Sequence, residues 1–231
     1  MRKVLTILSL FFIIITVSGV MLVPWLASAT LKTKLVDRLA TNDVQVEMSS
    51  SPSFALGLGQ IDTLHVIAHQ AKAGDVRLSE VTLDGEHIFV DMPALLLHDD
   101  GKLRRADSLT MRGVISQDNL REVLASKADK LENVQVTIQP DTVLITGQTK
   151  ILGRMADVEL EGRVVGDRGG IYFDMTRLAV KNARIGTAKL GDMFGNITLV
   201  KADKIPLGMR IEDVQQRDGS IVVTAKRPQQ E

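Results

Sequence analysis

Hydrophobic residues are spaced in three different ways along the chain, and the first is an unbroken run. Residues 4–29 contain no charged side chain and are mostly apolar, and Arg2 and Lys3 precede them. About twenty apolar residues are enough for a helix to cross the hydrocarbon core of a bilayer. The basic pair favours an N-terminus in the cytoplasm, with the rest of the chain on the other side. We therefore expect a transmembrane or signal helix within residues 1–29.

Two fates of this leader are compatible with its sequence. Ala27, Ser28 and Ala29 form an A-x-A site behind Pro24, which is typical of the end of a cleavable signal peptide. The run is longer than the usual signal-peptide core, however, and Trp25 is placed like the interfacial aromatic residue of an anchor. The chain is thus expected to be anchored outside the cytoplasm or, if cut after Ala29, to be released there.

The second spacing is helical, and it first occurs directly after the leader. Leu31, Leu35 and Leu39 recur every four positions, with charged residues between them. This pattern predicts a juxtamembrane amphipathic helix within residues 30–43, which packs on the following domain or lies on the lipid headgroups.

A stronger helical pattern covers residues 116–131. Ser116 is a good N-cap residue, and the following polar and apolar positions define one apolar face. We predict one amphipathic helix here. Its apolar face consists of Leu120, Val123, Leu124, Ala128 and Leu131.

The third spacing is an alternation of apolar and polar residues, which predicts β-strands in most of the remaining chain. A change of parity between Leu78 and Val81 indicates a β-bulge or a strand with both faces covered. Residues 54–59 are interpreted as a strand bent by glycines. Residues 183–195 carry no clear pattern beyond a possible short helix at 188–194. The expected strands centre on residues 44–48, 61–68, 76–83, 88–90, 109–114, 134–138, 143–145, 158–160, 171–175, 178–180, 209–211 and 221–225.

These elements predict the fold class. The turns between the strands, such as Asp218-Gly219, are typical of hairpins, so the sheet should be antiparallel. A sheet and a helix that each have one apolar face bury these faces against each other. We expect an α+β, mostly β domain at residues 44–226, in which a long, strongly curved antiparallel sheet wraps around the one amphipathic helix. Residues 227–231 form a polar, frayed tail.

Composition narrows the choice of partners. The 28 basic and 28 acidic residues give a net charge of +0, which offers no electrostatic basis for binding nucleic acid. The absence of cysteine removes disulfides, thiolate metal sites and a cysteine nucleophile. Aromatic residues make up only 3% of the chain, against 45% hydrophobic residues. The interior is therefore aliphatic, which suits lipid acyl chains and equally suits an ordinary core.

The histidines are the nearest approach to a reactive cluster. His65 and His69 would share one face of a strand, and the absence of a glutamate after the first histidine argues against a zinc-protease motif. We interpret both as surface residues, with a metal site as the weaker alternative, and give His87 and His98 the same interpretation. We predict no catalytic residue, no metal and no cofactor.

Five short stretches resemble one known family. They are residues 53–66 (SFALGLGQIDTLHV), 76–88 (VRLSEVTLDGEHI), 115–120 (ISQDNL), 205–211 (IPLGMRI) and 217–223 (RDGSIVV). In order and spacing, over residues 35–226, they are similar to the LmeA-like family of bacterial phospholipid-binding cell-envelope proteins. The resemblance implies a non-enzymatic lipid-binding domain outside the bacterial cytoplasmic membrane and a tubular-lipid-binding-like shape. It implies no catalytic residues, and residues 183–204 lack the helix that the family leads us to expect.

The predicted function is phospholipid binding for storage, sensing or transfer in the bacterial envelope. The alternative is an envelope assembly scaffold that pairs through sheet edges, and an extracytoplasmic hydrolase is a weaker third possibility. The expected partners are a phospholipid or other acyl-chain lipid and the membrane itself. Candidate residues for the apolar lining are Leu120, Val123, Leu124, Ala128, Leu131, Phe54, Phe173 and Met175, each of which would also fit a plain core.

Overall fold

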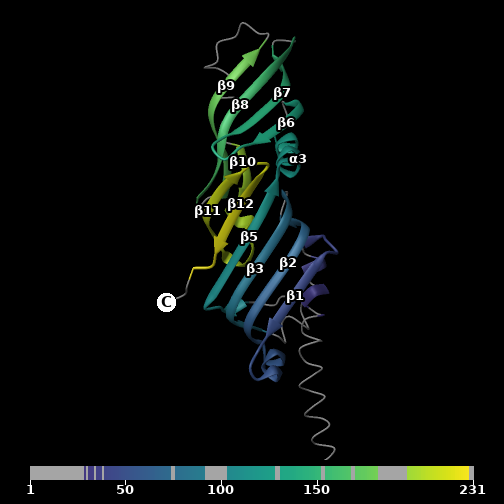
Figure 1. The fold of residues 1–231 in the computed structure, drawn as a ribbon, viewed down its shortest axis with the longest axis vertical. Coiled ribbons are helices and arrows are strands. Elements are labelled where there is room, and N and C mark those ends of the chain that lie inside the picture. The colour runs from purple at the N-terminus through teal and green to yellow at the C-terminus, as the bar shows by residue number, and fades with distance from the viewer. Residues whose placement is uncertain are drawn as a thin grey trace, which may run out of the picture. The chain divides into compact units, whose positions relative to one another are not determined.

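The computed structural model is mostly β, as the alternation predicts (Figure 1). The structure describes Ala29 and residues 31–33, 35–37, 39–73, 76–91, 103–127, 131–151, 154–167, 170–181 and 197–228. The elements are β1 (Val44–Ser49), η1 (Ser53–Leu58), β2 (Gln60–Ala73), β3 (Val76–Val90), β4 (Leu103–Arg105), β5 (Ser108–Ser116), α3 (Gln117–Lys127), β6 (Glu132–Ile138), β7 (Val143–Ile151), β8 (Arg154–Asp167), β9 (Gly170–Lys181), β10 (Ile197–Lys201), η2 (Ala202–Lys204), η3 (Pro206–Gly208), β11 (Arg210–Arg217) and β12 (Ser220–Lys226).

The strands form two sheets instead of the single long sheet that was predicted. The seven-stranded sheet has the order β1-β2-β3-β5-β12-β11, with β4 paired to β3, and the five-stranded sheet has the order β10-β9-β8-β7-β6. The pairs of known register are antiparallel, as expected, and several contain bulges, for example between Glu161 and Gly162. The single-sheet prediction was wrong because alternation identifies strands but does not say which strands pair.

The chain divides into two compact units. The first comprises residues 1–67, 83–109 and 229–231, and the second comprises residues 68–82 and 110–228. Strand β1 starts at Val44 and β12 ends at Lys226, and the domain boundaries expected at residues 43 and 226 stay a prediction.

The first unit contains β1, η1, β4 and parts of β2 and β3. Ile61, Leu64 and Val66 of β2 are buried, as their spacing predicts. The interpretation of residues 54–59 as a strand was wrong, because residues 54–58 belong to the 3₁₀ helix η1 and Gly59 is its C-cap. Pro52 has no N–H for a strand ladder, while its carbonyl accepts a hydrogen bond from the Ala55 amide at 2.9 Å.

The predicted change of parity in β3 is confirmed by burial. Val76 and Leu78 are buried, and the next buried residue is Val81, so the inward-facing parity changes there. A further change follows near Ile88, where His87 has a positive φ of 46°. The strand therefore turns different sets of side chains inward along its length.

The second unit contains the helix. Strand β5 ends at Ser116, whose Oγ accepts a hydrogen bond from the Asn119 amide at 3.3 Å, so the predicted N-cap is confirmed. The helix α3 ends at Lys127, and residues 128–130 lie outside the described residues. Strand β12 pairs antiparallel with β5, from Ser220↔Ser116 to Lys226↔Thr110.

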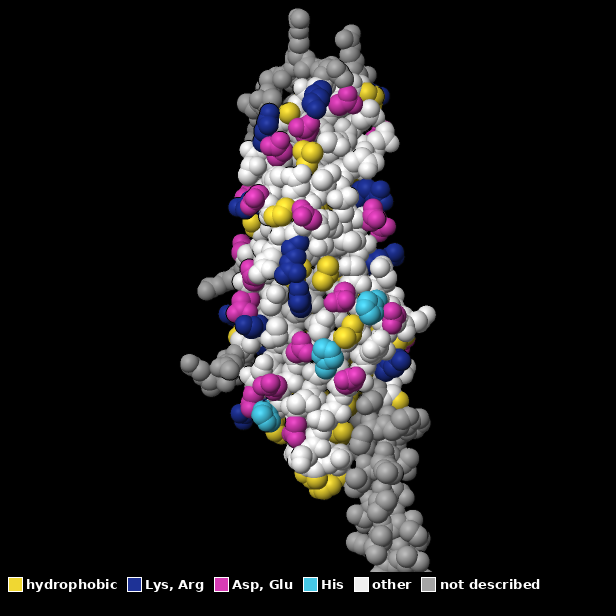
Figure 2. Space-filling view, in the orientation of Figure 1, with side chains coloured by type: hydrophobic (Ala, Val, Ile, Leu, Met, Phe, Trp, Pro, Cys, Tyr) yellow, Lys and Arg dark blue, Asp and Glu magenta, His cyan; other side chains and the backbone are white. Residues whose placement is uncertain are grey.

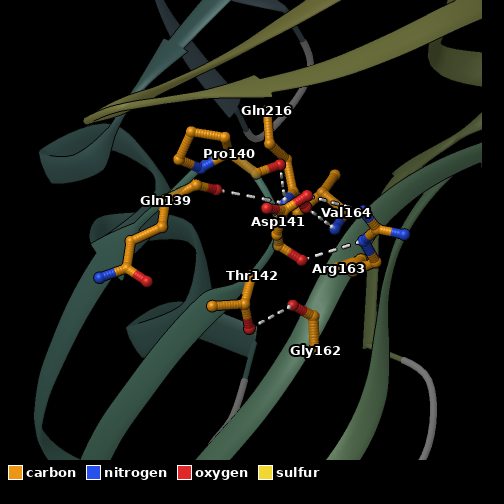
Figure 3. A network of polar contacts seen from close by, with 8 residues as sticks. All are labelled: Gln139, Pro140, Asp141, Thr142, Gly162, Arg163, Val164 and Gln216. Carbon is orange, nitrogen blue, oxygen red and sulfur yellow. Dashed lines mark hydrogen bonds and ion pairs between the residues drawn. The ribbon is translucent and has the colours of Figure 1, made fainter.

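Within the second unit, the side chain of Gln216 on β11 joins the two sheets (Figure 3). Its Oε1 accepts a hydrogen bond from the Val164 amide of β8 at 2.7 Å, and its Nε2 donates to the carbonyls of Gln139 and Pro140 at 3.4 and 3.3 Å. Apolar side chains of β11 pack against β8 beside this contact, at Gly166. The β6–β7 turn, β8 and β11 are thereby held together.

Several predictions concern residues only partly described. The predicted helix after the leader is present at Ala29, residues 31–33 and 35–37, and Leu39, while its position beside a membrane stays a prediction. Among the described residues, no helix is long and apolar enough to cross a membrane. Three predictions lie outside the described residues: the leader at residues 4–28, the possible helix at 188–194 and the surface position of His98. Strand β10, by contrast, was not predicted.

Candidate functional site

The apolar face of α3 is the centre of the candidate lipid site. Leu120, Val123 and Leu124 are only 1%, 3% and 1% exposed. They share one face because positions three and four apart are neighbours on a helix. The more exposed positions of α3, such as Glu122, face away. The sequence pattern therefore identified the buried side of this helix correctly.

Strands β6 and β10 cover this face of α3. Their inward side chains are aliphatic, for example Val136 and Ile138 on β6 and Leu199 on β10, all of them buried. Leu199 was missed because strand β10 was not recognised. The helix thus lies against an interior made of aliphatic side chains, as the composition predicted.

Phe173 supports the same interior from β9. It is fully buried and pairs with Ile197 of β10, the strand against which α3 packs. A Cβ atom at Gly162 on the neighbouring strand β8 would lie 2.7 Å from the ring, so only glycine leaves room for it. Gly162 also lies at the bulge of β8. The large ring is therefore accommodated by a backbone feature of the adjacent strand.

The other candidate residues are distributed differently. Leu131 is buried and lies beside Gly147 of β7, while Met175 on β9 is only half-buried. Ala128 lies outside the described residues. Phe54 belongs to the first unit and is 55% exposed on η1, so the structure does not bury it in an apolar interior. Its apolar character alone gave no information about which element would contain it.

Asn119 is a polar residue of this site that the sequence did not single out. It lies in the first turn of α3 and is only 6% exposed, and its Nδ2 has no hydrogen-bond partner among the described residues. A buried donor without a partner costs about 1–3 kcal/mol. Its spacing of four from Val123 was the available signal, because it places Asn119 at the border of the apolar face. The site therefore combines an aliphatic wall with one amide donor.

A polar hollow of about 470 Å³ lies on the first unit, where β1, β2 and β3 lie side by side. His65 Nδ1 and Asp84 Oδ1 are 2.6 Å apart, and the hydroxyls of Ser49 and Thr63 are 2.7 Å apart. A serine nucleophile needs a base within hydrogen-bond reach, but here the serine bonds to the threonine and the histidine to the aspartate. This arrangement is that of a polar sheet face.

The three histidines that the structure describes, His65, His69 and His87, lie at the surface, as predicted. The side chains of His65 and His69 are 44% and 41% exposed, and both face carboxylates of β3. His87 lies 3.5 Å from Asp107. Figure 2 shows the histidine side chains on one face, with acidic residues next to them. Among the described residues, no three histidine or acidic side chains are grouped so that they could hold a metal ion.

A second hollow, of about 290 Å³, lies on the five-stranded sheet. Lys181 Nζ donates to Glu159 Oε2 at 2.7 Å. This hydrogen bond, together with the charge of Lys181, lowers the pKa of Glu159, and the same contact raises the pKa of Lys181. Both groups therefore stay charged around neutral pH, which suits a surface ion pair and not proton transfer.

Comparison with known proteins identifies the family. The family model described as LmeA-like phospholipid-binding matches residues 21–226, which includes α3 and every strand of both sheets. No curated protein and no solved structure matches the chain. Because the match covers nearly the whole chain, this protein belongs to the LmeA-like phospholipid-binding family.

Proposed function

We propose that this protein binds phospholipid without catalysing a reaction, and that the acyl chains lie against the apolar face of α3. Membership of a phospholipid-binding family supports lipid binding in general. The observation that carries the choice of site is the aliphatic interior around Leu120, Val123 and Leu124, with the single amide donor of Asn119 at its border. An aliphatic wall with few polar groups is the usual lining of a site for apolar ligands.

Access to this site requires movement of α3. Because β6 and β10 cover the apolar face, an acyl chain reaches it only when the helix separates from one of these strands. Burial of each methylene contributes about 0.8 kcal/mol, so an acyl chain of about fifteen methylenes gains on the order of 12 kcal/mol. An isolated helix as short as α3, with 11 residues, is marginal in water. The helix therefore depends on its packing, and lipid replaces the packing that is lost.

Asn119 supplies the polar contact in this proposal. Its Nδ2 would donate a hydrogen bond to an ester carbonyl or phosphate oxygen of the lipid. Such a bond removes the cost of burying an unpaired donor, which makes the contact more favourable than one at an exposed asparagine. Because its Nδ2 only donates, the residue selects for the oxygen-rich part of the lipid.

The leader gives this activity its place in the cell. We place the domain outside the cytoplasmic membrane of a bacterium, anchored through residues 4–29 or released after Ala29. An anchored domain would take lipid directly from the bilayer for storage, sensing or local transfer, whereas a released one would act as a diffusible carrier. Sequencing of the mature N-terminus distinguishes these two arrangements.

The test is to measure bound lipid on the purified protein. The chain without its leader is expressed with a secretion signal, purified without detergent and analysed by mass spectrometry after extraction. We expect phospholipid near one molecule per chain, reduced in Leu124→Asp but not in Val165→Asp. Val165 is a matched control because it is an aliphatic residue of the same unit that is 39% exposed. A folded protein that carries no lipid would contradict the proposal.

The assembly scaffold is weaker as a candidate function. The strand at one edge of the seven-stranded sheet, β11, carries Arg210, Glu212, Asp213 and Arg217. Charged residues on an edge strand oppose the addition of another strand. This edge therefore does not favour pairing with a partner protein.

A further inference from the structure

The short helix η1 presents apolar side chains outward at the end of β1. Phe54 and Leu58 are 55% and 69% exposed, whereas Ala55 and Leu56 between them are 4% and 2% exposed. The inner pair fastens η1 to the first unit, and Gly59 ends the helix with a φ of 82°. The outer pair contributes little to this packing. An element with one anchored side and one exposed apolar side is typical of a binding surface.

A third exposed side chain belongs to the same end of the sheet. The Val90 amide of β3 donates to the carbonyl of Gly59 at 2.8 Å, which fixes the end of β3 next to η1. Phe89, which precedes Val90, is 38% exposed. Figure 1 places η1 where the arrow of β1 ends, and Figure 2 shows hydrophobic side chains at that end. We call Phe54, Leu58 and Phe89 the apolar tip.

The segment that carries Phe54 and Leu58 lacks charge, whereas Phe89 pairs with Arg105 of β4. Residues 48–61 contain no charged residue, although 24% of the chain is charged. Burial of a charge in hydrocarbon is costly, so a segment that enters lipid must lack charges. The serines and Pro52 before the helix are neutral polar or apolar residues that tolerate the headgroup region.

The size of the tip argues for a lipid partner over a protein partner. Fully buried aromatic side chains cover about 150–250 Å² each, so three partly exposed side chains offer roughly 300 Å². A stable protein interface needs about 800 Å² from each partner. Insertion into the interfacial region of a bilayer, by contrast, needs only a few apolar side chains on one face.

The sequence joins the tip to the predicted anchor through a short segment. The apolar run ends at Ala29, and the helical residues Ala29, 31–33, 35–37 and Leu39 belong to the same compact unit as η1. Only 24 residues separate Ala29 from Phe54 in the sequence, and β1 takes up six of them. The unit that carries the tip is therefore the one that is joined to the predicted anchor.

We infer that the apolar tip inserts into the surface of the phospholipid bilayer and docks the first unit against the membrane. This contact is separate from the lipid site at α3, since it belongs to the other compact unit and uses none of its residues. The first unit would make this contact with the bilayer even if the α3 interior carried no lipid. The occupant is a bilayer surface, recognised by its apolar interior below a neutral headgroup layer.

The absence of cysteine from the chain makes a direct test possible. Full-length protein carrying Leu58→Cys is labelled with an environment-sensitive fluorophore and reconstituted into vesicles of phosphatidylcholine and phosphatidylglycerol. Leu207→Cys is the matched control, because Leu207 is a leucine in another 3₁₀ helix and is 44% exposed. Neither substitution removes buried packing.

We expect the label at position 58 to shift its emission to the blue and to lose intensity when the vesicles contain lipids brominated near the headgroup. The label at position 207 should keep the emission that it has in water. Adding Phe54→Asp to the Leu58→Cys chain should restore the emission that the label at position 58 has in water and abolish its quenching. Thermal melting checks that this double variant retains the fold. Equal quenching at both positions, no quenching at position 58, or quenching that persists beside Phe54→Asp would each overturn the inference.

Discussion

The hydrogen bonds of Gln216 lead to a prediction of how much free energy of unfolding the contact between the two sheets of the second unit contributes. Substitution of Gln216 by alanine removes the acceptor of the Val164 amide, at 2.7 Å, and two longer hydrogen bonds to carbonyls of the β6–β7 turn. The backbone of β8 cannot easily find another partner there, because Val164 is only 3% exposed. The neighbouring residue Gln215 contacts only exposed side chains of its own strand, which makes Gln215→Ala the matched control.

The size of the effect follows from these bonds. A buried amide left without an acceptor costs about 1–3 kcal/mol. The two longer bonds, at 3.3 and 3.4 Å, are at the limit of good geometry and add only about 0.5 kcal/mol together. We therefore expect Gln216→Ala to lower the free energy of unfolding by about 2–3 kcal/mol. For a chain of this size, that corresponds to a fall in Tm of about 5–10 °C.

Thermal unfolding followed by circular dichroism measures this difference, and hydrogen exchange assigns it to the contact. In Gln216→Ala, the Val164 amide should exchange much faster, while Gln215→Ala should change the free energy of unfolding by about 0.5 kcal/mol or less. If both variants melted at the same temperature and the Val164 amide stayed protected, Gln216 would not join the sheets in the way that Figure 3 indicates.

Three further predictions concern the second unit. Leu124→Ala should cost about 3–5 kcal/mol of unfolding free energy, measured by urea denaturation, because it leaves a cavity under α3; a loss below 1 kcal/mol would mean that the helix is loosely packed. Gly162→Ala should cost at least about 1–3 kcal/mol in the same assay, since the new methyl group would overlap the ring of Phe173 and a backbone carbonyl of β9; unchanged stability would contradict this packing. Lys181→Met should raise the pKa of Glu159 toward its ordinary value in an NMR titration. Because the pKa of Glu159 is lowered in the folded chain, the stabilisation of the fold by this ion pair is present at neutral pH and is lost as the pH falls through that pKa. The pKa of Lys181 is raised, so on the alkaline side the ion pair stops stabilising the fold only in strong alkali. An unmoved Glu159 titration in Lys181→Met would contradict this assignment.

The elements that the sequence predicted well are those with local signals. The inward face of α3 follows from the spacing of Leu120, Val123 and Leu124 and from the Ser116 N-cap, all within a few residues of each other. The change of inward-facing parity in β3 between Leu78 and Val81 is likewise visible in the sequence. Such features depend on neighbours along the chain, which a single sequence displays directly.

The features that were missed depend on residues far apart. The pairing of β5 with β12 joins Ser116 to Ser220, and no local pattern identifies that partner. The same is true of the division into two sheets and of Gln216, whose role depends on Val164 in another sheet. A glutamine on an alternating strand is read as solvent-facing unless its distant partners are known.

Short apolar segments were ambiguous for a different reason. Residues 54–59 alternate with glycine in a way that fits a bent strand or a helical turn, and length does not separate the two. The structure forms η1 there and leaves Phe54 exposed. For this residue we therefore propose a contact with the bilayer in place of a contact with bound acyl chains.

The proposed lipid site is tested most closely by locating the acyl chain on the protein. Deuterated protein with protonated leucine methyl groups is loaded with a phospholipid whose acyl chains are protonated, and intermolecular NOEs are recorded by NMR. Our interpretation predicts NOEs from the acyl chain to the methyl groups of Leu120 and Leu124 on α3. If the lipid binds but its acyl chain gives NOEs only to exposed leucines such as Leu207, the α3 interior is not the lipid site.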